Sequence, residues 1–306
     1  MSTPLPWHQI DTVLLDMDGT LIDLHFDSHL WQTLVPARYA ERLGLPLAEA
    51  KAQIDTHYHA VNGTLDWYCV DYWTRTLGLD IRALKQEILE KIQWRPNVIP
   101  FLAALKAAGK QVVLFTNAHP ASLSVKDARL GLAQHLDLMV STHELGWSKE
   151  SQHCWQALAE RLAFDPARTL FVDDSERILA ASAEFGIAHQ LGIRHPDSQM
   201  PPLTFQHFPA LDDYADLLPF LQSLAPAPRP AAVPVAPQTP AAKPIHLPSH
   251  SLGQLFVGRE ALLTQLHTQL GARPCGSHAP AVLAVLHGLG GMDQERLDRQ
   301  RCQLRA

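Results

Sequence analysis

Short runs of aliphatic residues alternate along the chain with longer segments in which apolar residues recur at helical spacing. Four of the short runs are typical of buried strands, because each is followed by polar residues and then by helical periodicity. These runs cover residues 13–15, 111–115, 136–140 and 169–172. The alternation predicts an α/β fold in which helices sandwich a Rossmann-like parallel sheet.

Helix ends and a long insertion refine this picture. Gly109 follows the helical pattern FLAALKAAG, and Gly186 follows ILAASAEFG. Glycine reaches the left-handed conformation that commonly closes a helix, so both are predicted C-terminal caps. Residues 24–95, between the first two strands, carry helical patterning and little strand signal. They are predicted to form a helical cap over the sheet.

The composition changes near Ala225, where proline and alanine supply most positions of APAPRPAAVPVAPQTPAAKPIHLP. Such a segment buries too little apolar surface to fold, so residues 225–250 are predicted to be an extended, disordered linker. We expect residues 1–224 to form the catalytic domain and residues 251–306 to form a short, incomplete tail.

The tail contains one helix-like segment, 259–270, and one strand-like run, 281–286, which leads into HGLGGM. With the preceding FVGR, these residues resemble the opening of a signal-transduction NTPase, in which a strand leads into a phosphate-binding glycine loop. That loop continues with glycine, lysine and a hydroxyl residue, whereas Asp293 and Gln294 follow here. No ATP binding is therefore expected at the tail, and the pattern indicates a truncated or frame-shifted remnant.

Composition and charge limit the partners. The chain has 306 residues, a formal net charge of -6 and a pI near 6.3, so it offers no broad cationic field to a nucleic acid polymer or an anionic membrane. The four cysteines are far apart and form no CxxC pair, which favours free thiols. Without a signal-peptide pattern or an apolar run of membrane-spanning length, the expected location is the cytoplasm.

Polar residues follow directly after the predicted strands. Because ligands bind beyond the carboxyl ends of the strands in an open α/β sheet, we expect these residues to converge on one site. Four carboxylates so close together repel one another unless a divalent cation lies among them, and oxygen ligands favour Mg²⁺. The set comprises Asp16, Asp18, Gly19, Thr20, Thr116, Asn117, Lys149, Asp173 and Asp174.

A phosphate ester fits this set of groups. Magnesium and Lys149 can neutralise a phosphate dianion, while Thr116 and Asn117 donate hydrogen bonds to its oxygens. A carboxylate can attack phosphorus to form an aspartyl-phosphate, and Asp16, at the strand end, is the candidate nucleophile. Asp18 is the candidate general acid for the leaving oxygen and general base for the attacking water.

Four motifs now stand in order: DMDGT (16–20), TN (116–117), Lys149 and DD (173–174). They resemble the motifs of the haloacid-dehalogenase-like hydrolase superfamily, over about residues 11–224. The resemblance implies that Asp16 is the nucleophile and Asp18 the general acid and base. It also implies that magnesium is held by Asp16, by the backbone carbonyl of Asp18 and by an acid of the last motif. One departure is Glu150, where many relatives have proline.

A narrower resemblance rests on WHQIDTVLLDMDGTLIDLHFD, LDWYCVDYW, FTNAHP and TLFVDDSERIL. These segments are similar to the bacterial GMP/IMP nucleotidases of the superfamily, which implies hydrolysis of purine ribonucleoside 5'-monophosphates. Four aromatic residues of the predicted cap offer surfaces for purine stacking, although packing inside a small helical cap is the favoured role. They are Trp67, Tyr68, Tyr72 and Trp73.

Other interpretations remain open. Taken singly, the acidic pairs could be helix caps, Thr116-Asn117 an ordinary turn and Lys149 a solvated surface residue. His57 and His59 lack further ligands nearby, so a surface or packing role is expected. His119, beside the TN motif, is as readily a substrate contact as a structural residue.

Two alternative functions also remain. One is a phosphosugar phosphatase or mutase of the same superfamily, and the other is a signalling protein that only binds phosphometabolites. A dehalogenase is disfavoured, because such enzymes need no general acid and typically lack the second Asp, here Asp18.

Overall fold

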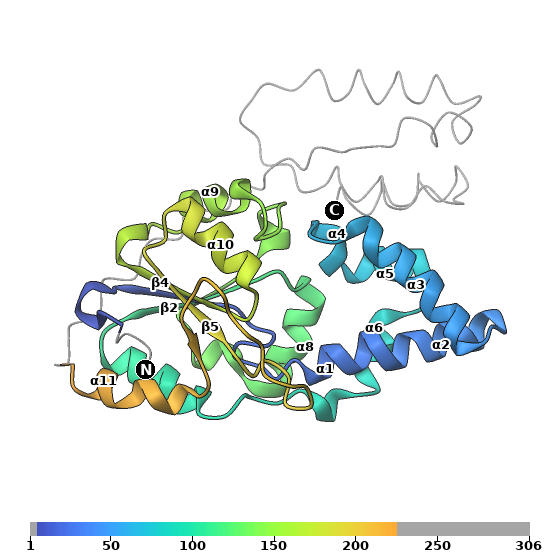
Figure 1. Cartoon of the computed structure of the whole chain (residues 1–306), viewed down its shortest axis with the longest axis horizontal. Coiled ribbons are helices and arrows are strands. Elements are labelled where there is room, and N and C mark those ends of the chain that lie inside the picture. The colour runs from blue at the N-terminus through green and yellow to red at the C-terminus, as the bar shows by residue number, and fades with distance from the viewer. Residues whose placement is uncertain (1–4, 225–306) are drawn as a thin grey trace, which may run out of the picture. The chain divides into compact units, whose positions relative to one another are not determined.

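The computed structural model describes residues 5–224, and its centre is a six-stranded sheet (Figure 1). The strand order is β3-β2-β1-β4-β5-β6, and every neighbouring pair is parallel. The predicted α/β class and parallel sheet are therefore confirmed. The strands are β1 (Thr12–Leu15), β2 (Gln111–Thr116), β3 (Leu138–Ser141), β4 (Thr169–Asp173), β5 (His189–Ile193) and β6 (Ala210–Leu211).

Helices cover both faces of the sheet, as Figure 1 shows for α9 and α10 on one side and α11 on the other. Side chains alternate between the faces along a strand. Leu14 accordingly joins the apolar cluster that contains Trp155 of α9, whereas Val13 and Leu15 join the cluster that contains Phe101 of α7. The α-helices that follow residues 24–95 in the chain are α7 (Val98–Ala107), α8 (Pro120–Leu130), α9 (Gln152–Arg161), α10 (Glu176–Phe185) and α11 (Leu218–Gln222).

The two predicted glycine caps are confirmed. Gly109 has φ +72° and Gly186 has φ +109°, both in the left-handed region that favours glycine. Gly186 directly ends α10, and Gly109 follows the last turn of α7. Each glycine turns the chain from a helix toward the following strand.

Residues 24–95, named the helical insertion from here on, contain six α-helices, several of which Figure 1 labels to one side of the sheet. The chain leaves and returns to the sheet domain at adjacent points, since Asp23 N donates to Gln93 O at 2.9 Å and Arg95 N donates to Leu21 O at 3.0 Å. The helices are α1 (His25–His29), α2 (Val35–Leu43), α3 (Leu47–Val61), α4 (Leu65–Tyr68), α5 (Val70–Leu77) and α6 (Ile81–Gln86), with a π-helical segment at Leu30–Leu34.

Aromatic side chains hold the helical insertion together. Trp73 is 1% exposed, and its ring centroid lies 5.0 Å from those of Tyr58 and Tyr72 in edge-to-face contacts. Trp67 packs against Tyr58 at 5.3 Å. Trp73 is therefore a packing residue, which leaves no exposed face of its ring for a purine.

The sequence pattern missed the last two strands and misplaced the start of β3. β5 contains polar residues and Gly192, whose missing side chain leaves room for the ring of Phe205, and β6 has only two residues. β3 begins at Leu138, two residues later than expected. The predicted linker (225–250) and tail (251–306) lie outside the described residues. Within residues 5–224, no helix combines the length and apolarity that crossing a bilayer requires.

Candidate active site

The site residues predicted from the motifs meet at the carboxyl ends of three neighbouring strands. Asp16 follows β1, Thr116 ends β2 and Asp173 ends β4. Because β1 lies between β2 and β4 in a parallel sheet, their carboxyl ends share one edge. Topology alone thus brings together motifs that are more than 150 positions apart in sequence.

Lys149 lies between two of the carboxylates. Its Nζ donates to Asp16 Oδ1 at 2.6 Å and to Asp173 Oδ2 at 2.7 Å. The lysine side chain is only 1% exposed, so it is not a solvated surface residue. Its backbone is fixed as well, because Trp155 Nε1 donates to Lys149 O at 2.8 Å.

Thr116 and Asn117 form a rigid, buried turn beside this lysine. Thr116 Oγ1 accepts a hydrogen bond from Ala118 N at 3.1 Å. Asn117 Oδ1 accepts from Thr142 Oγ1 at 3.1 Å and from Lys149 N at 2.9 Å. The side chain of Asn117 therefore positions the backbone of the residue that carries the ammonium group.

Glu150, the departure noted in the motif pattern, connects several parts of the site. Its Oε1 accepts from Tyr68 OH of the helical insertion and from Arg177 of α10, both at 2.8 Å. Its Oε2 accepts from Asn117 Nδ2 at 3.2 Å. A proline at this position could make none of these contacts.

The sequence patterns missed a second buried lysine. Lys126 Nζ, from α8, donates to Asp18 Oδ1 and to Asp27 Oδ2, both at 2.5 Å. Lys85 Nζ donates to the other oxygen of Asp27 at 3.3 Å. Asp18 and Lys126 are 108 positions apart, and no motif contains Lys126, so only tertiary packing reveals the pair.

Burial dominates the electrostatics of the first motif. Desolvation raises the pKa of Asp16 to about 6, although Lys149 opposes this shift. Desolvation likewise raises the pKa of Asp18 to about 6, against the opposing charge of Lys126. Burial alone would lower the pKa of Lys149, but Asp16 and Asp173 raise it above its ordinary value, so its ammonium group stays charged.

The negative charge of the Asp174 carboxylate is not offset by a direct contact with a described residue. No residue within the described part of the chain forms a hydrogen bond or ion pair with its side chain, and desolvation, followed by the charges of Asp173 and Asp16, raises its pKa well above the ordinary value. Gly19, at φ +79°, makes room for it, since a Cβ there would lie 2.4 Å from Asp174 Oδ2. The site thus holds an excess of negative charge that a divalent cation would offset.

Comparison with known proteins agrees with this geometry. The model of the haloacid dehalogenase-like hydrolase family matches residues 10–186, a span that includes all four motifs. The chain belongs to this family. This chain is also 49% identical over 221 residues to "GMP/IMP nucleotidase YrfG" of Escherichia coli K12. The match covers 72% of this chain and 100% of that protein. A protein of the same name from Shigella flexneri gives the same values.

Two solved structures share the fold of the hydrolase. A HAD phosphatase from Thermococcus onnurineus superimposes with a TM-score of 0.60 at 20% identity, covering 71% of this chain and all of the other. A predicted phosphoglycolate phosphatase from Haemophilus somnus gives a TM-score of 0.50 at 21% identity, with 69% and 98% coverage. At these identities, the comparison concerns the fold alone.

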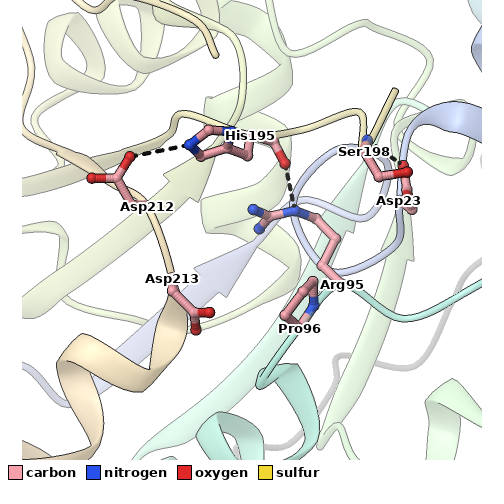
Figure 2. Close-up of a pocket in the computed structure, with 7 residues that line it drawn as sticks. All are labelled: Asp23, Arg95, Pro96, His195, Ser198, Asp212 and Asp213. Carbon is pink, nitrogen blue, oxygen red and sulfur yellow. Dashed lines mark hydrogen bonds and ion pairs between the residues drawn. The ribbon is translucent and has the colours of Figure 1, made fainter. Parts of the chain in front are cut away.

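The hydrolase also has a cavity of about 190 Å³ that contains none of the motif residues (Figure 2). In it, His195 Nε2 pairs with Asp212 Oδ1 at 3.3 Å, and Arg95 Nε donates to His195 O at 3.0 Å. Arg95 also donates to Thr20 O at 3.1 Å and so stabilises the end of the first motif, DMDGT. We assign the phosphate chemistry to the buried charge cluster rather than to this cavity, because the cavity lacks the lysine and the strand-end carboxylates.

The remaining histidines occupy different environments. On α3 of the hydrolase, His57 is half-buried and His59 is exposed. His119 caps α8, where its Nδ1 accepts from Ala121 N at 3.1 Å. A contact between His119 and substrate stays a prediction.

Proposed function

We propose that this hydrolase is a magnesium-dependent phosphomonoesterase that releases phosphate from GMP and IMP, as a purine 5'-nucleotidase. The observation that carries the proposal is the buried ammonium group of Lys149, held between Asp16 and Asp173. A cation fixed beside a candidate nucleophile suits a phosphate dianion. The purine substrate rests on the 49% identical relative, which the chain covers over its whole length.

Asp16 is the proposed nucleophile. Its carboxylate attacks phosphorus, the bond between phosphorus and the ester oxygen breaks, and the nucleoside oxygen leaves with a proton from Asp18. Asp18 then takes a proton from a water that attacks phosphorus, the bond between phosphorus and the Asp16 oxygen breaks, and inorganic phosphate is released. Both carboxyl groups return to their starting state, so one water is consumed for each phosphate released.

The environment of Asp18 suits this double role. A pKa of about 6 leaves about one tenth of the group protonated at pH 7, so both forms are accessible near neutral pH. The contact with Lys126 holds the carboxylate in place while the proton moves. Lys126 is thus the proposed positioning residue for the general acid and base.

The proposed phosphate-binding residues are Lys149, Asn117 and Thr116. Lys149 supplies the positive charge, and the Thr116 hydroxyl, which accepts from Ala118 N, still has its own proton to donate. Asn117 Nδ2 donates to Glu150 in this structure, and we propose that it donates to a phosphate oxygen when substrate binds.

Three carboxyl-bearing residues fit a magnesium ion. Asp16 and Asp174 would hold it through their carboxylates and Asp18 through its backbone carbonyl, because Asp173 already uses one oxygen for Lys149 and the other for Ser175 N at 2.8 Å. The uncompensated carboxylate of Asp174 is the observation that favours a cation here. When bound, magnesium would supply positive charge for the substrate phosphate and orient it.

Phosphate release by the purified full chain tests the proposal. With Mg²⁺, we expect turnover of GMP and IMP to exceed that of sugar phosphates and to stop in EDTA. Asp16→Asn should lower kcat by about 1,000-fold or more, because no covalent intermediate can form. Circular dichroism of the variant checks that its fold is intact.

The other outcomes identify the alternatives. Preferred hydrolysis of sugar phosphates would indicate a phosphosugar phosphatase, and isomerised sugar phosphate without phosphate release would indicate a mutase. Binding of phosphometabolites with no turnover across the panel would indicate a binding protein and would contradict the enzymatic proposal.

A further inference from the structure

Three residues with metal-binding side chains meet on the side of the TN motif that faces the helical insertion. Cys69, His119 and His143 each offer a ligand atom, and these atoms all lie within 4.8 Å of one another. The two imidazole rings are 4.9 Å apart. Asp71 lies beside the cluster, with its Oδ2 3.7 Å from His119 Nε2.

The chemistry of these ligands differs from that of the carboxylate site. One thiolate and two imidazoles suit a borderline or soft transition metal, whereas magnesium prefers oxygen ligands. We propose that Cys69, His119 and His143 form a second metal site, with Zn²⁺ as the ion of best fit and water in the fourth position. The three side chains supply one sulfur and two nitrogen donors, and a tetrahedral zinc ion can take water as its fourth ligand.

One nitrogen of the cluster has no hydrogen-bond partner among the described residues. His143 Nε2 is buried, and none of the described groups forms a hydrogen bond with it. A buried unpaired nitrogen is rare in native proteins and calls for a partner. Burial lowers the pKa of His143 to about 4 and also lowers that of His119, so both rings are neutral at pH 7, as ligation requires.

The surroundings of the cluster orient its ligands. Arg82 binds Asp71 Oδ1 at 2.7 Å and leaves Oδ2 directed at His119. Ligation through His119 Nε2 moves the ring proton to Nδ1 and gives up the hydrogen bond from Ala121 N. That loss is one neutral hydrogen bond, which a bond to a divalent metal outweighs. Binding also releases the thiol proton of Cys69 to solvent, because the thiolate is the ligand.

The proposed zinc site would join the helical insertion to the sheet domain. Cys69 and Asp71 belong to the insertion, whereas His119 and His143 follow β2 and β3. His119 is two residues beyond Asn117 of the phosphate motif. A metal bound here therefore fixes the insertion over the phosphate motif, and we infer that Zn²⁺ inhibits turnover. The inhibition rests on the proposed function, but the binding does not.

Metal titration of the full chain tests the site without reference to activity. Cys275 and Cys302, which lie outside the described residues, are first replaced by serine so that they cannot contribute thiolates. Mg²⁺ is kept in excess to occupy the carboxylate site. We expect one Zn²⁺ per chain by calorimetry, and Co²⁺ should give the visible bands of a tetrahedral ion and a sulfur-to-metal band in the near ultraviolet.

Variants locate the bound metal. Cys69→Ser and His143→Gln, made separately, should each weaken Zn²⁺ binding by at least 10-fold, and Cys69→Ser should abolish the sulfur-to-cobalt band. Cys154→Ala and Asp16→Asn are the matched controls, because neither residue belongs to the cluster, and both should bind Zn²⁺ as the parent does. Zn²⁺ should also protect Cys69 from alkylation.

Two results would overturn the site. One is equal Zn²⁺ affinity in Cys69→Ser, His143→Gln and the parent, and the other is loss of binding in Asp16→Asn alone, which would place zinc among the carboxylates. If zinc binds as expected but leaves phosphate release unchanged, the second site stands and the inhibition is wrong. If no variant or parent hydrolyses nucleotides, the proposed function fails while the binding result still decides the site.

Discussion

The hydroxyl of Tyr68 donates a hydrogen bond of 2.8 Å to Glu150, which directly follows the buried Lys149. Tyr68 belongs to α4 of the helical insertion, and Glu150 belongs to the sheet domain. The contact thus connects the insertion with the residue next to the ammonium group that is proposed to bind phosphate. A second connection nearby runs from Ser148 Oγ to Gly63 O at 3.0 Å.

Tyr68→Phe is expected to lower kcat/KM for GMP about 10-fold, because a hydrogen bond to a charged group is worth about 1.5 to 3 kcal/mol. Arg177 still pairs with Glu150 in the variant, so the fold should persist. Tyr58→Phe is the control, since the Tyr58 hydroxyl donates to Trp31 O inside the insertion. Equal loss in both variants would contradict a specific role for the Tyr68 contact.

Lys126→Met is expected to lower the free energy of unfolding by about 3 kcal/mol, because it leaves the partly buried Asp18 carboxylate without its cation and leaves Asp27 with Lys85 alone. Urea denaturation measures the change. Adding Asp27→Asn should restore part of the stability by removing one of the two charges. Lys106→Met, which disrupts a looser 3.9 Å pair with Asp137, should cost less than about 1 kcal/mol.

A comparison of Gly19→Ala with Gly146→Ala separates the cost of backbone strain from the steric displacement of Asp174. Gly19 and Gly146 have nearly equal φ values of +79° and +81°, but a Cβ at Gly146 meets nothing within 4 Å. The left-handed φ alone should cost both alanine variants about 1 kcal/mol of stability, and the close contact with Asp174 should add to the loss in Gly19→Ala. Only Gly19→Ala should also lose about 100-fold in kcat, since it displaces a proposed metal ligand. Equal activities of the two variants would exclude that role for Asp174.

Cys154 is expected to resist alkylation in the native protein. It is 0% exposed, and burial raises its pKa from an ordinary 9.0 to about 12, so about one thiol in 10,000 is ionised at pH 8. Peptide mass spectrometry should find Cys154 modified by iodoacetamide only after unfolding. Modification of Cys154 at the same rate in folded and unfolded protein would contradict this expectation.

The raised pKa of Cys154 also determines how the stability of the protein changes with pH. The folded state disfavours the thiolate, so the contribution of Cys154 is complete below pH 9 and is lost as the pH rises from about 9 towards 12. The free energy of unfolding of Cys154→Ala should therefore fall less steeply over that pH range than that of the parent protein. Chemical denaturation at several alkaline pH values measures the slope for both proteins.

Local sequence was sufficient to predict the centre of the sheet. β1, β2 and β4 are buried on both faces, so each appears as an almost continuous aliphatic run. β5 and β6 lie toward one edge of the sheet, and β5 mixes polar residues with Gly192. Their pairing depends on the neighbouring strand more than on their own composition, which is why the pattern did not reveal them.

A similar division applies to the candidate site. The predicted Asp16 and Asn117 directly follow β1 and β2, and Asp173 ends β4, so the parallel topology determines that they meet. Lys149 lies further along the chain, beyond the 3-10 helix that follows β3, and reaches the same edge from there. Lys126 lies in the middle of a helix, and its position against Asp18 depends on how that helix packs. The cluster around Cys69 combines three distant segments, none of which has metal-binding spacing by itself.

The antiparallel bridge between Ile22 and Trp94 closes the base of the helical insertion and brings its two ends together. A module attached by adjacent ends can be grafted or exchanged without changing the order of the strands around it. Evolution could therefore vary the helical insertion while retaining the proposed catalytic carboxylates that follow β1. Chimeras joined at this bridge offer a direct way to transfer substrate preference between relatives.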